Sequence, residues 1–169
     1  MIAAGRAIPD HELDAIAQTL QVSDAINIQY TSGTTGFPKA AMLTHRNILM
    51  NAWYVTEMQA ITENDRMCVQ VPFYHCLGCV MGSLGAVVRG AAIVVPAEYF
   101  NARASLETLE AERCTIIYGV PTMLVAMLEQ ESLHRRNLKS LRSGIMAGSP
   151  SPIEVMRKVL HAVNKYPTR

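Results

Sequence analysis

From residue 66 onward the sequence alternates short apolar segments with stretches of helical periodicity, and this alternation limits the fold more than any other feature. The predicted strands are 66–71, 91–95, 115–118 and 141–148, and the predicted helices are 76–88, 102–113, one opened by Pro121, and a last one that begins after residue 152. Strands that alternate with helices are typical of a parallel sheet covered by helices. We therefore expect an α/β fold, with a largely parallel sheet and helices on both faces.

The first 50 residues show a different order of elements. Residues 10–20 have helical spacing, and "AINIQYT" at 25–31 alternates like a strand. Glycine and proline at 33–38 predict a loop, after which "KAAML" can return as a short strand. Thr44 is then a plausible N-cap for the next helix. At the other end of the chain, Ser151 and Glu154 are spaced as a capping box.

Composition and charge argue against one class of partner. Half of the 169 residues are apolar, which is enough for a buried core. The 15 lysines and arginines are nearly balanced by 14 aspartates and glutamates, and no basic stripe is present. Nucleic acid is therefore not an expected partner.

The cysteines and the apolar segments indicate a cytoplasmic protein. Cys68, Cys76, Cys79 and Cys114 lie in apolar sequence, and we interpret them as reduced core residues. The N-terminus lacks the apolar region of a signal peptide. The segment 76–88 holds only thirteen residues and includes three glycines, so a buried helix explains it better than a transmembrane span.

The loop "YTSGTTGFPK" at 30–39 is the strongest candidate for a binding site. Its hydroxyl side chains can donate hydrogen bonds, and glycines let the backbone approach a ligand. Successive backbone N–H groups can form an anion-binding concavity, to which Lys39 adds a positive charge. The spacing differs from that of a Walker loop. The residues alone leave two readings open: a polyphosphate site, or an ordinary surface loop.

Residues 30–47, "YTSGTTGFPKAAMLTHRN", resemble the signature of the adenylate-forming enzymes, which include acyl-CoA synthetases, luciferases and peptide-synthetase adenylation domains. Ala40 departs from it, since the family usually has glycine there. "VPFYHCLG" at 71–78, "YGVPTM" at 118–123 and "IMAGSPSP" at 145–152 resemble further family segments in the same order. The residues in these segments are most similar to those of medium-chain fatty acyl-CoA synthetases.

The resemblance implies a ligase of fatty acid metabolism that joins a carboxylate to ATP and then passes the acyl group to the thiol of coenzyme A. It implies that the phosphates are held by Thr31, Ser32, Gly33, Thr34, Thr35, Gly36 and Lys39. His75 would lie between the acyl chain and the α-phosphate, so His75 and Lys39 are the catalytic candidates. Gly148, Ser149 and Pro150 would border adenine, and "YGVPTM" would border the acyl pocket.

Each of these assignments has a structural alternative. His75 can be a hydrogen-bonded core histidine. The turn at 148–150 can serve only to connect a strand to a helix, and Thr44 to Asn47 fit the start of a helix. His75 with Cys76 and Cys79 lacks the second pair of ligands that a structural zinc needs, so no metal site is expected within the sequence.

Later motifs of the family are missing from these 169 residues, including the glutamate that helps to hold Mg²⁺ and the lysine of the mobile C-terminal lid domain. We expect residues 1–169 to be part of an AMP-binding (adenylation) domain without the lid, inactive alone and prone to self-association through an incomplete sheet. Two alternatives stay open: a non-catalytic nucleotide-binding module, and a ligase for an aryl acid or another carboxylate.

Overall fold

The computed structural model describes residues 5, 8–31, 33 and 36–164. The chain divides into two units, Met1–Met50 and Asn51–Arg169, which are described separately. Among the described residues, no helix combines the length and the apolar character that crossing a bilayer requires.

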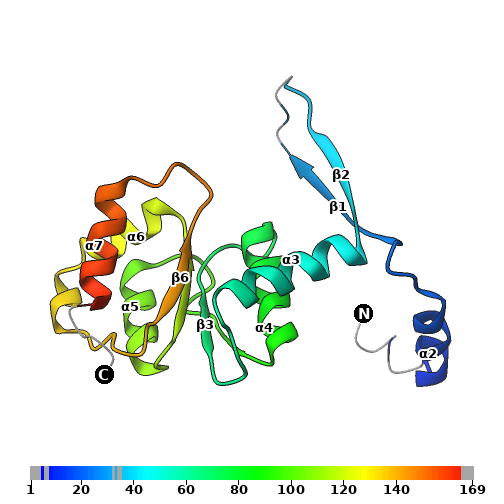
Figure 1. Ribbon diagram of the computed structural model, residues 1–169, viewed down its shortest axis with the longest axis horizontal. Helices are drawn as coiled ribbons and strands as arrows, with labels where there is room; N and C mark the ends of the chain where they lie inside the picture. The colour runs from blue at the N-terminus through cyan, green and yellow to red at the C-terminus, as the bar shows by residue number, and fades with distance from the viewer. Residues whose placement is uncertain (1–4, 6–7, 32, 34–35, 165–169) are drawn as a thin grey trace. The chain divides into compact units, whose positions relative to one another are not determined.

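A β-hairpin is the main element of the first unit (Figure 1). It follows helix α2 (Asp10–Thr19), and its strands β1 (Ala25–Thr31) and β2 (Lys39–Thr44) pair in antiparallel register. Thr31 lies opposite Lys39, so the two ends of the loop 32–38 are held next to each other. The predicted helix, strand, loop and return strand are thus all present.

Helix α3 (His45–Met58) begins where the sequence predicted it. The Thr44 hydroxyl accepts a hydrogen bond from the backbone N–H of Asn47 at 3.2 Å, and the Asn47 side-chain oxygen accepts one from the backbone N–H of Thr44 at 3.0 Å. These reciprocal bonds satisfy backbone donors at the helix start. Thr44 and Asn47 therefore stabilise the start of the helix, as the sequence indicated.

The second unit contains a parallel sheet of four strands in the order β4-β3-β5-β6. The strands are β3 (Arg66–Val69), β4 (Ala92–Val94), β5 (Ile116–Gly119) and β6 (Ser143–Met146). Between them lie η1 (Leu77–Leu84), α4 (Gly85–Arg89), α5 (Ala102–Ala111), α6 (Pro121–Leu128) and η2 (Glu131–Arg135), and α7 (Ile153–Asn164) follows β6.

Two hydrophobic clusters, one on each face, fix the sheet between its helices. Cys68 points into a cluster with Leu106 and Leu109 of α5. Its neighbours in β3, Met67 and Val69, point the other way, into a cluster that includes residues of η1 and α4. Figure 1 shows α5, α6 and α7 on one side of the sheet and η1 and α4 on the other. The predicted architecture, with helices on both faces, is confirmed.

Three local expectations need correction. The helix predicted over 76–88 begins as the π-helix η1 and continues as α4. Cys68 and Cys114 are buried, as expected, but Cys76 is exposed and Cys79 half-buried. The Ser151–Glu154 capping box is not formed. Instead, the Ser151 hydroxyl donates to the Met146 carbonyl at 3.4 Å, and Glu154 pairs with Arg157.

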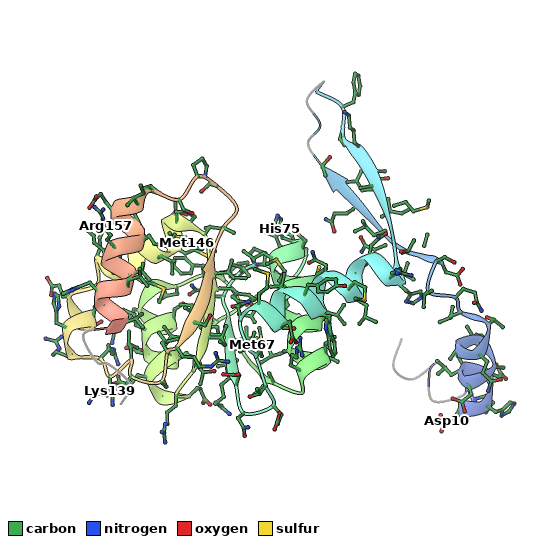
Figure 2. The ribbon with its side chains drawn as sticks, in the orientation of Figure 1. Asp10, Met67, His75, Lys139, Met146 and Arg157 are labelled. Carbon is green, nitrogen blue, oxygen red and sulfur yellow. The ribbon has the colours of Figure 1, made fainter. Side chains whose placement is uncertain are left out.

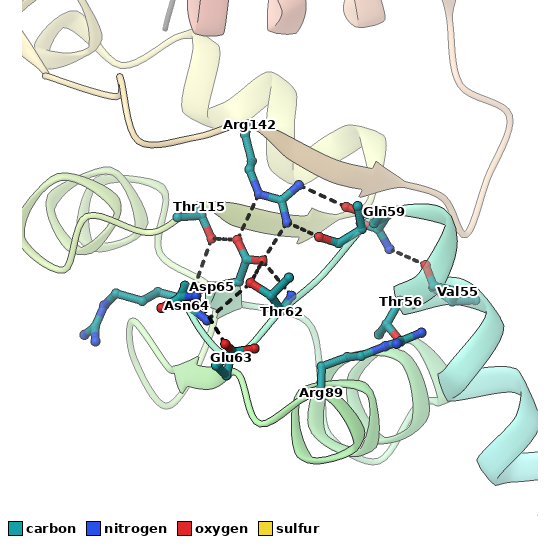
Figure 3. Close-up of polar contacts among 12 residues, drawn as sticks. Val55, Thr56, Gln59, Thr62, Glu63, Asn64, Asp65, Arg89, Thr115 and Arg142 are labelled. Carbon is teal, nitrogen blue, oxygen red and sulfur yellow. Dashed lines mark hydrogen bonds and ion pairs between the residues drawn. The ribbon is translucent and has the colours of Figure 1, made fainter.

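A polar network ties the amino ends of the strands together (Figure 3). The Arg142 guanidinium donates to both carboxylate oxygens of Asp65, at 2.9 and 2.6 Å, and to the carbonyls of Gln59 and Ala60. The Thr115 hydroxyl donates to the same carboxylate at 2.6 Å. Asp65 is only 4% exposed. Burial alone would raise the pKa of Asp65, but these hydrogen bonds lower it from an ordinary 3.8 to about 2.

The network predicts a pH-dependent contribution to stability. Because the pKa of Asp65 is lowered on folding, its contribution is complete above the unfolded pKa and is lost as the pH falls toward 2. We expect Asp65→Asn to reduce the free energy of unfolding by about 2 kcal/mol at pH 7. Urea unfolding at pH 7, 4 and 2.5 should show the difference between wild type and variant shrinking with acid. Glu154→Gln, which removes an exposed ion pair, is the matched control and should change little. A difference independent of pH would contradict the assignment.

Candidate active site

The hairpin loop of the first unit has the backbone that the sequence predicted. Gly33 has φ +63° and Gly36 has φ +84°, values that favour glycine. A Cβ at Gly33 would lie 2.3 Å from the Phe37 carbonyl oxygen, so this turn is too tight for any side chain. Thr31, Gly36 and Lys39 are exposed, and Gly33 is half-buried. The described donors Thr31 and Lys39 are thus open to solvent rather than packed in a core. Ser32, Thr34 and Thr35 lie outside the described residues.

His75 lies in the second unit, in the segment that joins β3 to η1. Its Nδ1 accepts a hydrogen bond from the backbone N–H of Leu77 at 3.2 Å, which leaves Nε2 as the protonated nitrogen of the neutral ring. The residue is exposed, so it is not the core histidine of the structural alternative. An exposed ring with a fixed Nδ1 can offer its Nε2–H to a ligand.

The structure explains why a glycine, Gly78, stands three residues after His75. A Cβ at this position would lie 2.2 Å from the Pro72 carbonyl oxygen. The His75 carbonyl accepts hydrogen bonds from the backbone N–H groups of Gly78 and Cys79, each at 2.9 Å. The chain between Pro72 and Gly78 is therefore a closed turn that holds the imidazole outward.

The turn after β6 holds the residues predicted to border adenine. Gly148 has φ +89°, and a Cβ there would lie 3.0 Å from a side-chain methyl of Val120. The Ala147 N–H donates to the Gly119 carbonyl at 3.2 Å. Ser149 and Pro150 are exposed. The turn is thus packed against the segment "YGVPTM", which begins at the end of β5.

His75 and the Gly148 turn meet the same edge of the sheet. Val69 pairs with Tyr118, and Gly119 pairs with Met146, so the carboxyl ends of β3, β5 and β6 are in register. Figure 2 shows His75 and Met146 toward the same end of the sheet. Ligands of open parallel sheets bind outside the carboxyl ends of the strands. The loop 31–39 belongs to the other unit, and its predicted meeting with His75 stays a prediction.

The sequence analysis missed a pocket of about 400 Å³ at this edge. The pocket is bounded by the segments that follow β3 and β4 and by the first turn of α6, and its lining includes Gln70, Phe73, Tyr74, Tyr99, Phe100 and Met123. Gln70 is 8% exposed, and neither of its amide atoms has a hydrogen-bond partner among the described residues. The signal in the sequence was a glutamine inside the apolar strand "CVQV".

Tyr118, the first residue of "YGVPTM", supports the edge rather than lining the pocket. It is 1% exposed, and its hydroxyl accepts a hydrogen bond from the Gln59 side chain at 2.8 Å. Burial raises the pKa of the phenol, and the Gln59 bond offsets part of that effect. The Tyr118 side chain therefore packs in the core beneath this edge.

The chain belongs to the AMP-binding enzyme family, whose model matches residues 3–167. It is 48% identical to YngI of Bacillus subtilis (strain 168) over 155 residues, 92% of this chain and 28% of that protein. It is 43% identical to the mitochondrial medium-chain acyl-CoA ligase ACSF2 of Danio rerio over 166 residues, 96% of this chain and 27% of the relative.

The fold is also similar to that of solved adenylate-forming enzymes. The crystal structure of ATP-bound MatB from Rhodopseudomonas palustris superposes with a TM-score of 0.76 at 26% identity, covering 83% of this chain and 27% of MatB. The chain therefore spans somewhat more than a quarter of the length of the relatives it matches. The family resemblance inferred from the motifs is confirmed.

The tight turn before His75 gives a test of the site's local geometry. We expect Gly78→Ala to lower the free energy of unfolding by about 2 kcal/mol, because the added methyl group overlaps the Pro72 carbonyl. Gly5→Ala is the matched control, since nothing lies within 4 Å of a Cβ there. Equal unfolding midpoints in urea for the two variants would show that the turn is not as tight as described.

Proposed function

We propose that the chain is part of an acid–thiol ligase that uses ATP to convert a carboxylic acid to an acyl-adenylate and then to an acyl-CoA. The supporting observation is the family match over 3–167. The loop that carries the signature residues fits it, since Gly33 and Gly36 have positive φ there. ATP, the acid and coenzyme A are the proposed small-molecule partners. Mg²⁺ would accompany ATP, with ligands that we place largely outside these residues.

In this proposal the loop holds the β- and γ-phosphates. Its backbone N–H groups, the hydroxyls of Thr31, Ser32, Thr34 and Thr35, and the Lys39 ammonium would stabilise the charge that develops on the leaving pyrophosphate. Gly33 and Gly36 allow the backbone to approach the phosphates, as their positive φ values support. This is catalysis by positioning and charge rather than by a covalent intermediate with the loop.

His75 and the Gly148 turn would hold the other parts of the reaction. The Nε2–H of His75 would donate to the acid or to the α-phosphate where the two are joined. Gly148, Ser149 and Pro150 would pack along adenine, supported by their place at the carboxyl edge and the exposure of all three. A medium-chain fatty acid is the proposed substrate. The name of the Danio rerio relative, a medium-chain acyl-CoA ligase, supports that choice.

The domain organisation is part of the proposal. We propose that residues 1–169 form part of an adenylation domain and that activity requires the remaining length of the relatives, including a C-terminal lid. Exposed apolar side chains on the hairpin, such as Ile28 at 60% and Met42 at 69%, support self-association of the isolated chain. We propose a cytoplasmic location, although the Danio rerio relative is named as mitochondrial. Cell fractionation tests this location.

Lys39 offers the sharpest test of the proposed reaction. In the longer protein, we expect Lys39→Ala to reduce acid-dependent ATP–pyrophosphate exchange roughly 100-fold or more, because it removes a charge that stabilises the leaving group. Lys158→Ala, an exposed lysine of α7, is the matched control and should leave exchange unchanged. Equal rates for Lys39→Ala and wild type would contradict the assignment of the loop.

The isolated 169-residue chain gives a second test. We expect it to show no acid-dependent exchange above the rate of its own Lys39→Ala variant, because the lid and the later motifs are needed. Robust exchange by the isolated chain would show that those parts are not required. ATP binding without exchange in the longer protein would instead favour a non-catalytic nucleotide-binding module.

A further inference from the structure

Cys76 and Cys79 form a cysteine pair at the start of a helix, and the proposed reaction gives them no task. The sequence predicts both as buried core residues, but Cys76 is exposed and Cys79 is half-buried. The other two cysteines, Cys68 and Cys114, are 1% and 0% exposed. The thiols that solvent reaches are therefore the two that lie only three residues apart.

One helical turn brings the two cysteines close to each other. Cys76 has helical backbone angles, φ −53° and ψ −32°. The His75 carbonyl accepts hydrogen bonds from the backbone N–H groups of Gly78 and Cys79, each at 2.9 Å. Cα atoms three residues apart in such a turn are separated by about 5 Å. This separation lies within the range of roughly 4.4–6.8 Å that a disulfide bond allows.

The burial pattern indicates that both thiols are on the outward side of the helix. Leu77, Gly78 and Val80 are buried, whereas Cys76 and Cys79 are not. Side chains three residues apart lie on the same face of a helix. A disulfide between these two cysteines would therefore cross one outward-facing turn and leave the buried side of the helix in place.

The His75 ring lies beside the outer thiol. The Cys76 Sγ–H donates to the His75 Nδ1 over 3.7 Å, and the backbone N–H of Leu77 donates to the same nitrogen. Reactive cysteines are typical of helix starts and of positions next to an imidazole, where the attacking thiolate is favoured. Cys76 has both of these neighbours. It is therefore the candidate for the attacking thiol, and Cys79 is the candidate for the resolving thiol.

We propose that Cys76 and Cys79 are a reversible redox pair, which a small-molecule disulfide such as glutathione disulfide converts to an intramolecular disulfide. The Cys76 thiolate attacks one sulfur of glutathione disulfide, and the first glutathione leaves with the proton that Cys76 gave up. The Cys79 sulfur then attacks the Cys76 Sγ, and the second glutathione leaves with the proton of Cys79. Two protein thiols are thus oxidised, and one glutathione disulfide is reduced to two thiols.

The disulfide would couple the redox state of the surroundings to the candidate active site. It would remove the S–H group beside the His75 Nδ1 and cross-link the turn that holds the imidazole outward. We therefore expect the oxidised protein to be the slower ligase. This consequence rests on the proposed function, whereas the disulfide itself does not. Disulfides of cytosolic proteins are usually transient, which agrees with a reversible pair in the proposed location.

The disulfide is tested in the full-length protein, in glutathione buffers of graded ratio. Free thiols are blocked with N-ethylmaleimide, and peptides are mapped by mass spectrometry after cleavage at Tyr74, which separates Cys68 from the pair. We expect a Cys76–Cys79 disulfide that increases with the share of glutathione disulfide and that dithiothreitol reverses. The buried Cys68 and Cys114 are internal controls and should stay reduced. Absence of the Cys76–Cys79 disulfide at every ratio would overturn the proposal.

Two variants separate the roles of the two thiols. Cys79→Ser lacks the resolving thiol and should accumulate a mixed disulfide of glutathione with Cys76. In Cys76→Ser, the half-buried Cys79 should react with glutathione disulfide roughly 10-fold more slowly than Cys76 does in Cys79→Ser. Thermal melts under reducing conditions establish that both variants are folded. Equal rates would overturn the assignment of Cys76 as the attacking thiol.

Acid-dependent ATP–pyrophosphate exchange measures the consequence for the site. We expect oxidised wild type to exchange roughly 2-fold to 10-fold more slowly than the same sample after dithiothreitol, the size of effect of one neutral hydrogen bond. Cys76→Ser is the matched control and should have equal rates before and after dithiothreitol. A change of the same size in Cys76→Ser would assign the effect to other cysteines and overturn the coupling to His75.

The two measurements also separate this inference from the proposed function. If no acid supports exchange in the longer protein, the ligase proposal fails, while a mapped Cys76–Cys79 disulfide still confirms the redox pair. If the disulfide forms and the exchange rate is the same in the oxidised and reduced protein, the influence on the His75 turn is overturned.

Discussion

The ion pair between Asp65 and Arg142 is the interaction on which the second unit depends. Arg142 directly precedes β6, and Asp65 directly precedes β3, so their bidentate contact joins two strands that are separated by β5. Thr115, just before β5, donates to the same carboxylate. Arg142 also donates to the carbonyls of Gln59 and Ala60, which follow α3. One buried carboxylate thus fixes the amino ends of the three strands that lead to the candidate site.

The fixed amino edge matters because the candidate site residues of this unit lie at the opposite edge. With the strands in register at their starts, their ends deliver the His75 segment, the "YGVPTM" segment and the Gly148 turn to neighbouring positions. Close packing keeps these segments in place, since Gly78 lies against Pro72 and Gly148 lies against Val120. Functional groups are held best when their supporting backbone is rigid. The polar network therefore holds the amino edge of the sheet, and the carboxyl edge carries the residues that we propose bind the substrates.

The alternation of elements made most of the fold predictable. Each predicted strand from residue 66 onward is present, because short apolar segments between helices have few other ways to bury both faces. The predictions that were wrong concern short stretches of the chain. The π-helical start of η1 and the unused capping box at Ser151 depend on contacts with distant residues, which periodicity and spacing along the chain do not report. The candidate residues themselves were found through motif resemblance rather than through periodicity.

By itself, the sequence determined the class of fold, through the alternation of its elements. Its motifs also determined the family, by resemblance, and singled out the loop 31–39, His75 and the Gly148 turn as candidates. Only the tertiary structure decided that both amide atoms of Gln70 are buried without a hydrogen-bond partner among the described residues, and that a pocket lies at the carboxyl edge of the sheet. It also decided that the His75 ring is exposed, with its Nδ1 bound by a backbone N–H. The reason is physical: burial and pairing depend on which segments meet in space, and residues far apart along the chain set both.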